Sequence, residues 1–237
     1  LDAARLSLRS GAGPFWCLGR LSVRPRSYQL VPLLMALRQE TIRLLISDDV
    51  GIGKTVEAGL IARELLDRGE IKRIGVLCPP QLCDQWQREL KQKFNIDAVV
   101  IRSGTVAKLE RERALSSGDS HIFSYYRHII VSLDYAKSER RRASFLTHSP
   151  DLVIVDEIHT ATCPREGASQ QLHQLVSKLA ENPNQHLILL TATPHSGIEA
   201  SFLSILGFLK PEFSQFPLDA LNQNQRIELA KHFIQRR

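Results

Sequence analysis

The residues best suited to chemistry lie first in the stretch Ser-Asp-Asp-Val-Gly-Ile-Gly-Lys-Thr-Val-Glu, at positions 47–57. Gly51 and Gly53 would let the backbone turn tightly enough for successive N–H groups to face phosphate oxygens. Lys54 would add a positive charge near the outer phosphates, and Thr55 would offer its hydroxyl to a magnesium ion. This combination predicts a loop that holds a nucleotide together with a metal ion.

The sequence on either side of this loop fits the same prediction. An apolar run at residues 42–46 predicts a strand before the loop, and apolar residues at helical spacing predict a helix after it. Val50 and Ile52 complete the expected nucleotide-binding residues, whereas Asp48 stands where the common template has its first glycine. The simpler alternative is a glycine-rich turn between a strand and a helix.

A second group of polar residues follows the apolar run at residues 151–156. Asp156 and Glu157 would lie at the carboxyl end of this strand, which is where open α/β sheets bind ligands. Asp156 would hold magnesium directly or through water, and Glu157 would orient and polarise the attacking water. Taken alone, the pair could also be an ordinary solvated strand end.

Other candidate residues leave two interpretations open. Thr191 and Thr193 follow a predicted strand at residues 186–190, and could either relay the state of the phosphate site or form a Ser/Thr turn. Gln29 could bind an adenine edge or be an exposed polar residue. The basic cluster at residues 137–142 could contact phosphates or form a solvated helix face. The formal charge of +6 favours an anionic partner such as nucleic acid, but it also serves solubility.

Apolar runs and helical patterns alternate along the chain, which predicts an α/β fold with a mostly parallel central sheet and helices on both faces. We expect an irregular lead-in over residues 1–23, one lobe over residues 24–212, and a helical extension over residues 213–237. The expected strands cover residues 42–46, 71–78, 98–101, 129–131, 151–156 and 186–190. The expected helices include residues 28–38, a stripe of Val106, Leu109 and Leu115, and residues 168–180, 199–209 and 222–237.

Together, the phosphate loop, the Asp156-Glu157-Ile158-His159 sequence and the Thr191-Ala192-Thr193-Pro194 sequence resemble the first RecA-like lobe of a superfamily-two helicase. Finer features are similar to the Swi/Snf-like translocases, nearest the bacterial RapA-type and phage-defence DrmD-type branch. These features are Asp48-Asp49, Glu57-Ala58-Gly59, and Cys78-Pro79-Pro80 followed by Gln85-Trp86. The resemblance covers residues 24–237, and it departs from many members in having Ile158 in place of alanine.

This resemblance implies a RecA-like three-layer fold and an ATPase that tracks along double-stranded DNA, with ATP and Mg²⁺ as cofactors. Lys54, Asp156 and Glu157 would serve catalysis, and Thr55 and Asp156 would hold magnesium. The residues implied for adenine binding, coupling or nucleic-acid contact are Gln29, Gln85, Trp86, Ser132, His159, Thr191 and Thr193. A second RecA-like lobe with an arginine finger is expected in a longer chain, so we expect this lobe alone to turn over little ATP.

Two other functions remain open: an RNA-remodelling or strand-separating helicase lobe, and a nucleotide-binding interaction module with little turnover. The chain begins without methionine, which suggests a fragment or a processed start, and residues 233–237 resemble the element at which a second lobe begins, so we expect the chain to be cut at that hinge. The four cysteines lack paired metal-ligand spacing, and the apolar runs are too short to span a membrane. These features predict reduced thiols in a bacterial cytosol and no membrane partner.

Overall fold

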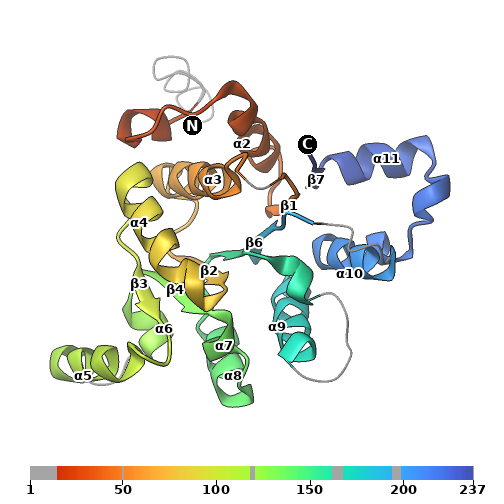
Figure 1. Ribbon diagram of the computed structural model, residues 1–237. Helices are drawn as coiled ribbons and strands as arrows, with labels where there is room; N and C mark the ends of the chain where they lie inside the picture. The colour runs from red at the N-terminus through yellow and green to blue at the C-terminus, as the bar shows by residue number, and fades with distance from the viewer. Residues whose placement is uncertain (1–14, 50, 118–120, 162–167, 194–198, 237) are drawn as a thin grey trace.

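The computed structural model describes residues 15–49, 51–117, 121–161, 168–193 and 199–236. Within these residues, seven strands form one sheet in the order β3-β4-β2-β5-β6-β1-β7, and every neighbouring pair is parallel (Figure 1). The strands are β1 (Arg43–Ile46), β2 (Ile74–Cys78), β3 (Val99–Ile101), β4 (His128–Ser132), β5 (Leu152–Val155), β6 (His186–Leu190) and β7 (Phe233–Ile234). The predicted parallel α/β sheet is confirmed.

The central strands are apolar along their whole length because helices cover both faces of the sheet. In β5, Leu152 and Ile154 point into one hydrophobic core, while Val153 and Val155 point into the other. All four side chains are fully buried. Burial on both faces is what makes a parallel strand appear in the sequence as a continuous apolar run.

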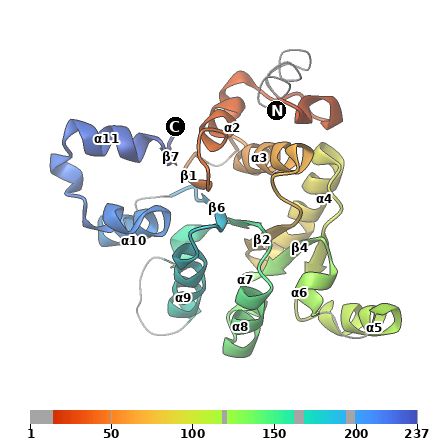
Figure 2. The ribbon, with the colours of Figure 1, turned by 180° about the vertical axis from the view of Figure 1, so that it is seen from behind.

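Helices cover the two faces in separate groups (Figures 1 and 2). The first core lies under α2 (Leu30–Ala36), α3 (Lys54–Arg68) and α4 (Cys83–Phe94). The second lies under α6 (Ile122–Tyr125), α7 (Leu133–Ala136), α8 (Glu139–Thr147), α9 (Ala168–Glu181) and α10 (Glu199–Leu209). Short 3₁₀ turns lie at Cys17–Arg20, Ser27–Gln29, Pro80–Leu82, Ile158–Ala161, Pro211–Gln215 and Leu218–Ala220. The predicted three layers are therefore present.

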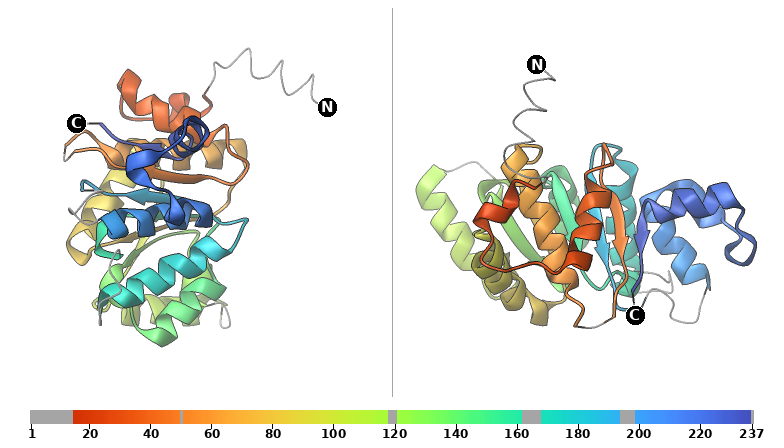
Figure 3. Two further views of the ribbon diagram at one scale, coloured as in Figure 1. Left: turned by 90° about the vertical axis from the view of Figure 1, so that its right-hand side faces the viewer. Right: turned by 90° about the horizontal axis from the view of Figure 1, so that it is seen from above.

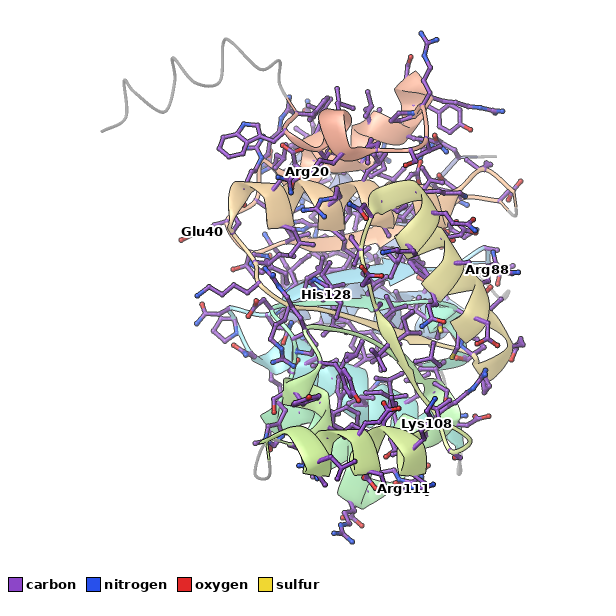
Figure 4. The ribbon with its side chains drawn as sticks, turned by 90° about the vertical axis from the view of Figure 1, so that its left-hand side faces the viewer. Arg20, Glu40, Arg88, Lys108, Arg111 and His128 are labelled. Carbon is purple, nitrogen blue, oxygen red and sulfur yellow. The ribbon has the colours of Figure 1, made fainter. Side chains whose placement is uncertain are left out.

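Helices also lie beyond the two edges of the sheet. Helix α11 (Gln223–Ala230) lies with α10 beyond the β7 edge, and α5 (Val106–Ser117) lies beyond the β3 edge (Figure 3). Arg88, Lys108 and Arg111 are exposed on the outer surface of α4 and α5, whereas His128 lies within the body of the molecule (Figure 4). The predicted apolar stripe of α5 is wrong at Leu115, which is 90% exposed.

The C-terminal segment differs from the helix predicted over residues 222–237. Helix α11 ends at Ala230, and the chain then pairs with β1 as strand β7. The backbone N–H groups of Leu45 and Ser47 donate to the carbonyl oxygens of His232 and Ile234, each at 2.8 Å. The open edge of β1 explains the difference, since an unpaired strand edge offers backbone groups that a continuing helix could not satisfy.

The lead-in is also more ordered over its described residues than the sequence predicts. Phe15 and Cys17 are buried in the first core. The backbone N–H groups of Trp16 and Cys17 donate to the two carboxylate oxygens of Glu64, at 3.0 and 2.8 Å. This segment is therefore anchored on α3 and closes the core beneath it.

Among the described helices, none is both long and apolar enough to cross a membrane.

Candidate functional site

The sheet brings the predicted chemistry to one edge. Strand β6 lies between β5 and β1, and its Leu190 is paired in register with Ile46 of β1. Because the strands are parallel, the segments that follow β1, β5 and β6 all leave the sheet on the same side. These segments are the phosphate loop, the Asp156-Glu157 pair and the Thr191-Thr193 turn.

The phosphate loop has the backbone that its glycines predict. Gly51 and Gly53 have φ angles of 90° and 108°, in the left-handed region that favours glycine. Helix α3 begins at Lys54, whose Nζ donates to the carbonyl oxygens of Asp48 at 2.6 Å and Asp49 at 3.3 Å. The lysine therefore spans the loop at the positive end of the helix. Val50 lies outside the described residues.

Gln29 packs directly against this loop. Its side chain is buried, with Oε1 accepting from the N–H of Arg26 at 3.0 Å and Nε2 donating to the carbonyl of Ile52 at 3.2 Å. The hydroxyl of Tyr28 donates to the same carbonyl at 3.2 Å. The alternative of an exposed polar residue is wrong, because the Gln29 side chain is buried and hydrogen-bonded to the backbone of the loop.

Asp156 is held by two hydrogen bonds at the end of β5. The indole Nε1 of Trp86 donates to Oδ2 at 2.8 Å, and the backbone N–H of Glu157 donates to Oδ1 at 2.9 Å. Burial raises the pKa of Asp156 above its usual range, and the bond from Trp86 opposes that shift. Trp86 is only 2% exposed, so the structure places it against the carboxylate and out of reach of a nucleic acid.

Glu157 begins a chain of polar contacts toward β6. Its backbone adopts a left-handed φ of 55°, which directs the chain into a 3₁₀ turn. Nδ1 of His159 lies 3.1 Å from Glu157 Oε2 and 3.2 Å from Thr191 Oγ1. Thr191 Oγ1 also accepts from the N–H of Thr193 at 3.1 Å. The close contact with His159 lowers the pKa of Glu157 below its usual range. Thr191 therefore contacts His159 as well as shaping a turn, and its role as a relay stays a prediction.

The charges at this edge suit a nucleotide–magnesium complex. Lys54 is close enough to both carboxylates for its charge to oppose the rise in the pKa of Asp156 and to add to the lowering of the pKa of Glu157. Within the described residues, no three His, Cys, Asp or Glu side chains form a metal-binding group. Magnesium keeps much of its water and commonly takes one or two protein ligands together with phosphates, so the assignment of Thr55 and Asp156 as its ligands needs no such group and stays a prediction.

The other predicted contact residues lie in different surroundings. Gln85 is exposed on α4, and its Nε2 donates to Oε1 of Glu89 at 3.0 Å. Ser132 is buried and caps α7, accepting from the N–H of Tyr135 at 3.3 Å. Ser132 therefore shapes the segment after β4 instead of presenting its hydroxyl to a ligand. The basic cluster at residues 137–142 lies around the start of α8, where Arg140 and Arg141 are exposed.

A buried charge cluster beside the loop was not predicted as part of the site. Asp48 and Glu57 are fully buried, and both contact the guanidinium of Arg236. Burial, reinforced by the charge of Asp48, raises the pKa of Glu57 to about 8. Asp48 and Glu57 were among the family-like features of the sequence. Their partner Arg236 was not, because it lies up to 188 positions away in a segment predicted to be helical.

The comparisons agree with this geometry. The model of the SNF2-related domain matches residues 28–227. The chain is 34% identical over 189 residues to the RNA polymerase-associated protein RapA of Stutzerimonas stutzeri, covering 79% of this chain and 19% of RapA. It is 32% identical over 190 residues to the uncharacterized ATP-dependent helicase YqhH of Bacillus subtilis, covering 80% of this chain and 30% of YqhH.

A solved structure shares the fold. The Sulfolobus solfataricus SWI2/SNF2 ATPase core in complex with double-stranded DNA superposes with a TM-score of 0.67 at 18% identity, covering 92% of this chain and 45% of that chain. The chain therefore spans about a fifth of RapA and under half of the archaeal core. With its parallel sheet, phosphate loop and acidic pair in the expected places, the chain belongs to the SNF2-related family, as a RecA-like first lobe.

Proposed function

We propose that this lobe binds ATP with Mg²⁺ and that, in a longer protein, it forms one half of an ATPase that translocates on double-stranded DNA. The observation that carries the proposal is the meeting of Lys54, Asp156 and Glu157 at one sheet edge, with Glu157 linked through His159 to Thr191. A phosphate loop alone would support nucleotide binding. The acidic pair and its relay support hydrolysis coupled to movement.

Each residue has a distinct part in this proposal. Lys54 and the loop N–H groups bind the phosphates, while Thr55 and Asp156 hold the metal, which neutralises phosphate charge when bound. Glu157 orients the attacking water and accepts its proton, and a lowered pKa keeps it ionised for that role. His159 and Thr191 connect this carboxylate to the turn after β6, where a second ligand can influence it.

Duplex DNA is the proposed polymer because the archaeal relative's ATPase core was solved with double-stranded DNA, and because the net charge of +6 suits a polyanion. RapA is described as RNA polymerase-associated, which favours work on DNA that is being transcribed. A second RecA-like lobe is part of the proposal, since this chain spans only a fraction of its relatives. The proposal places the protein in a bacterial cytosol, where ATP and DNA are both available.

The test uses the longer parent protein and measures ATP hydrolysis with and without duplex DNA. We expect duplex DNA to stimulate hydrolysis, and Glu157→Gln to lower it by about a hundredfold or more while leaving ATP binding intact. Glu181→Gln is the matched control, because Glu181 is exposed on α9 and pairs with Lys178. Equal hydrolysis by wild type and Glu157→Gln, or indifference to DNA, would sink the motor proposal.

Two further measurements separate the competing functions. Strand displacement should be assayed on DNA and RNA duplexes. Displacement of RNA strands would favour the RNA-remodelling alternative. Multiple ATP turnovers by the 237-residue chain alone would reject the view that it is an interaction module. We expect weak binding and almost no turnover, because an arginine from a second lobe is needed to stabilise the transition state.

A further inference from the structure

Arg236 joins three separate pieces of the nucleotide site. Its Nη1 donates to the carbonyl oxygen of Tyr28 at 2.5 Å, and its Nη2 donates to Asp48 Oδ2 at 2.5 Å and also to Glu57 Oε1. The guanidinium carbon lies 5.2 Å from the centre of the Tyr28 ring. We call Arg236, Tyr28, Asp48 and Glu57 the Arg236 cluster.

Each partner of Arg236 belongs to a different part of the loop's surroundings. Tyr28 precedes Gln29 and shares with it the carbonyl of Ile52 as acceptor. Asp48 begins the phosphate loop, and its carbonyl accepts from Lys54. Glu57 lies in the first turn of α3, whose N-terminus completes the loop. A movement of Arg236 would therefore disturb the contacts of three segments that shape the loop.

The charges make the arginine necessary in this position. Asp48 and Glu57 are 0% exposed, and Arg236 is the cation that forms an ion pair with both. Lys54 donates to backbone carbonyls of the loop and leaves these two side chains to Arg236. Removing this cation leaves the buried carboxylate of Asp48 uncompensated in a low dielectric and takes a hydrogen-bond donor from Glu57, so the surrounding backbone must rearrange.

Arg236 is itself placed by strand β7. The N–H groups of Leu45, Ser47 and Asp49 donate in succession to the carbonyl oxygens of His232, Ile234 and Arg236. The last of these bonds, from Asp49 at 3.2 Å, ties the backbone of Arg236 to the phosphate loop. Figures 1 and 2 both show the C-terminal end beside β1 and close to α2. The Arg236 cluster therefore forms when β7 docks on β1, because the same segment of chain makes both sets of contacts.

We propose that Arg236 is a positioning residue of the ATP site, through which nucleotide binding and the docking of β7 on β1 favour each other. This inference rests on the proposed function, since it concerns the same phosphate loop. The Arg236 cluster holds the loop in the shape that presents its N–H groups to phosphate. By reciprocity, a nucleotide that selects that loop shape must also stabilise β7 on the sheet edge. Displacing β7 releases the loop and weakens nucleotide binding.

The first experiment measures the affinity of the 237-residue chain for a fluorescent ATP analogue with Mg²⁺. We expect Arg236→Met to lower the affinity by about 5- to 150-fold, the range typical of coupled sites. Arg236→Lys should restore only part of it, because one ammonium lacks the fork that reaches three acceptors. Lys210→Met is the matched control, since Lys210 pairs with Glu228 in the same C-terminal region, away from the loop.

The second experiment follows hydrogen exchange in a peptide covering β7, with and without the nucleotide. We expect the nucleotide to slow exchange there in wild type and in Lys210→Met, and to have no such effect in Arg236→Met. A variant that merely loses stability would exchange faster throughout without losing this response. If Arg236→Met does not fold, the wild-type exchange and Arg236→Lys decide the question.

The outcomes separate the two proposals. If wild type fails to bind the nucleotide, the proposed function fails. If wild type binds it and Arg236→Met binds equally well, or if β7 exchanges at the same rate in both states of wild type, the role of Arg236 is overturned and the proposed function stands.

Discussion

The indole Nε1 of Trp86 donates a hydrogen bond to Oδ2 of Asp156 at 2.8 Å, and both side chains are buried. A helix on one face of the sheet thereby orients the carboxylate proposed to hold magnesium. Since burial raises the pKa of Asp156 and this bond opposes the rise, Trp86 helps to keep the carboxylate ionised.

Replacing Trp86 with phenylalanine should therefore weaken magnesium use. Loss of the donor raises the pKa of Asp156 further, and metal binding requires the ionised carboxylate. We expect the longer parent protein to need more Mg²⁺ for half-maximal ATP hydrolysis, with a stability loss of about 1–3 kcal/mol. Phe94→Leu, in the same helix and core, should lose stability at an unchanged Mg²⁺ requirement. Equal shifts in both variants would show that packing alone is responsible.

The contacts from Glu157 through His159 to Thr191 predict a non-additive pair of mutations. His159→Ala and Thr191→Ala should each reduce the stimulation of ATP hydrolysis by DNA, and the double variant should be little worse than either single one. Thr147→Ala is the control, because its hydroxyl donates to the carbonyl oxygen of Ala143 within α8, away from Glu157. Losses that multiply in the double variant would mean that the two residues act separately.

The two loop glycines should respond differently to the same substitution. Gly51 and Gly53 both have positive φ, so alanine at either position costs about 1–2 kcal/mol of backbone strain. A Cβ at Gly53 would lie 2.5 Å from Nε2 of Gln29, whereas one at Gly51 meets nothing within 4 Å. Gly53→Ala should therefore lose more nucleotide affinity than Gly51→Ala, as measured by equilibrium titration. Equal affinities would show that contact with Gln29 does not shape the loop.

His128 predicts a loss of stability in mild acid. Burial, with Arg127, Arg63 and Arg73 nearby, lowers its pKa to about 4 from an unfolded value near 6.5. Below pH 6.5 the unfolded chain takes up a proton that the folded chain refuses, so the free energy of unfolding falls as the pH drops toward 4. This one group contributes at most about 1.4 kcal/mol per pH unit.

Denaturant titrations of wild type and His128→Gln at pH 8 and pH 4.5 check this prediction. At pH 8 the histidine is neutral in both states, so the difference between the two proteins reports packing alone. We expect the glutamine variant to lose less stability between the two pH values than wild type does. Parallel losses would assign the acid sensitivity to other groups.

The sequence predicted the parts of the fold in which a local pattern reports burial directly. Strands β5 and β6 are apolar on both faces because helices cover both, and their runs were recognised. Strand β7 was not predicted, because two residues are too few to show an alternating pattern. Its pairing partner β1 also lies far away in the sequence. A strand this short is specified by the edge that it covers.

In the site, too, contiguous motifs were predicted from the sequence, whereas contacts between distant residues were not. The phosphate loop and the acidic pair are contiguous motifs, so their residue types predicted where they would lie. The bond from Trp86 to Asp156 joins residues 70 positions apart, and that from Arg236 to Asp48 joins residues 188 apart. No spacing rule connects such pairs, because the topology of the sheet alone brings them together. Trp86 was therefore predicted among residues for coupling or nucleic-acid contact, although its indole supports the carboxylate.

Strand β7 is the last strand of the described chain to be synthesised, yet it covers one edge of β1, the strand that leads into the phosphate loop. Until residues 233–234 leave the ribosome, the backbone of Leu45 and its neighbours in β1 forms an uncovered edge. Such edges invite pairing with other chains. A chain lacking these residues would expose that edge to other chains and leave the phosphate loop without the contacts of Arg236.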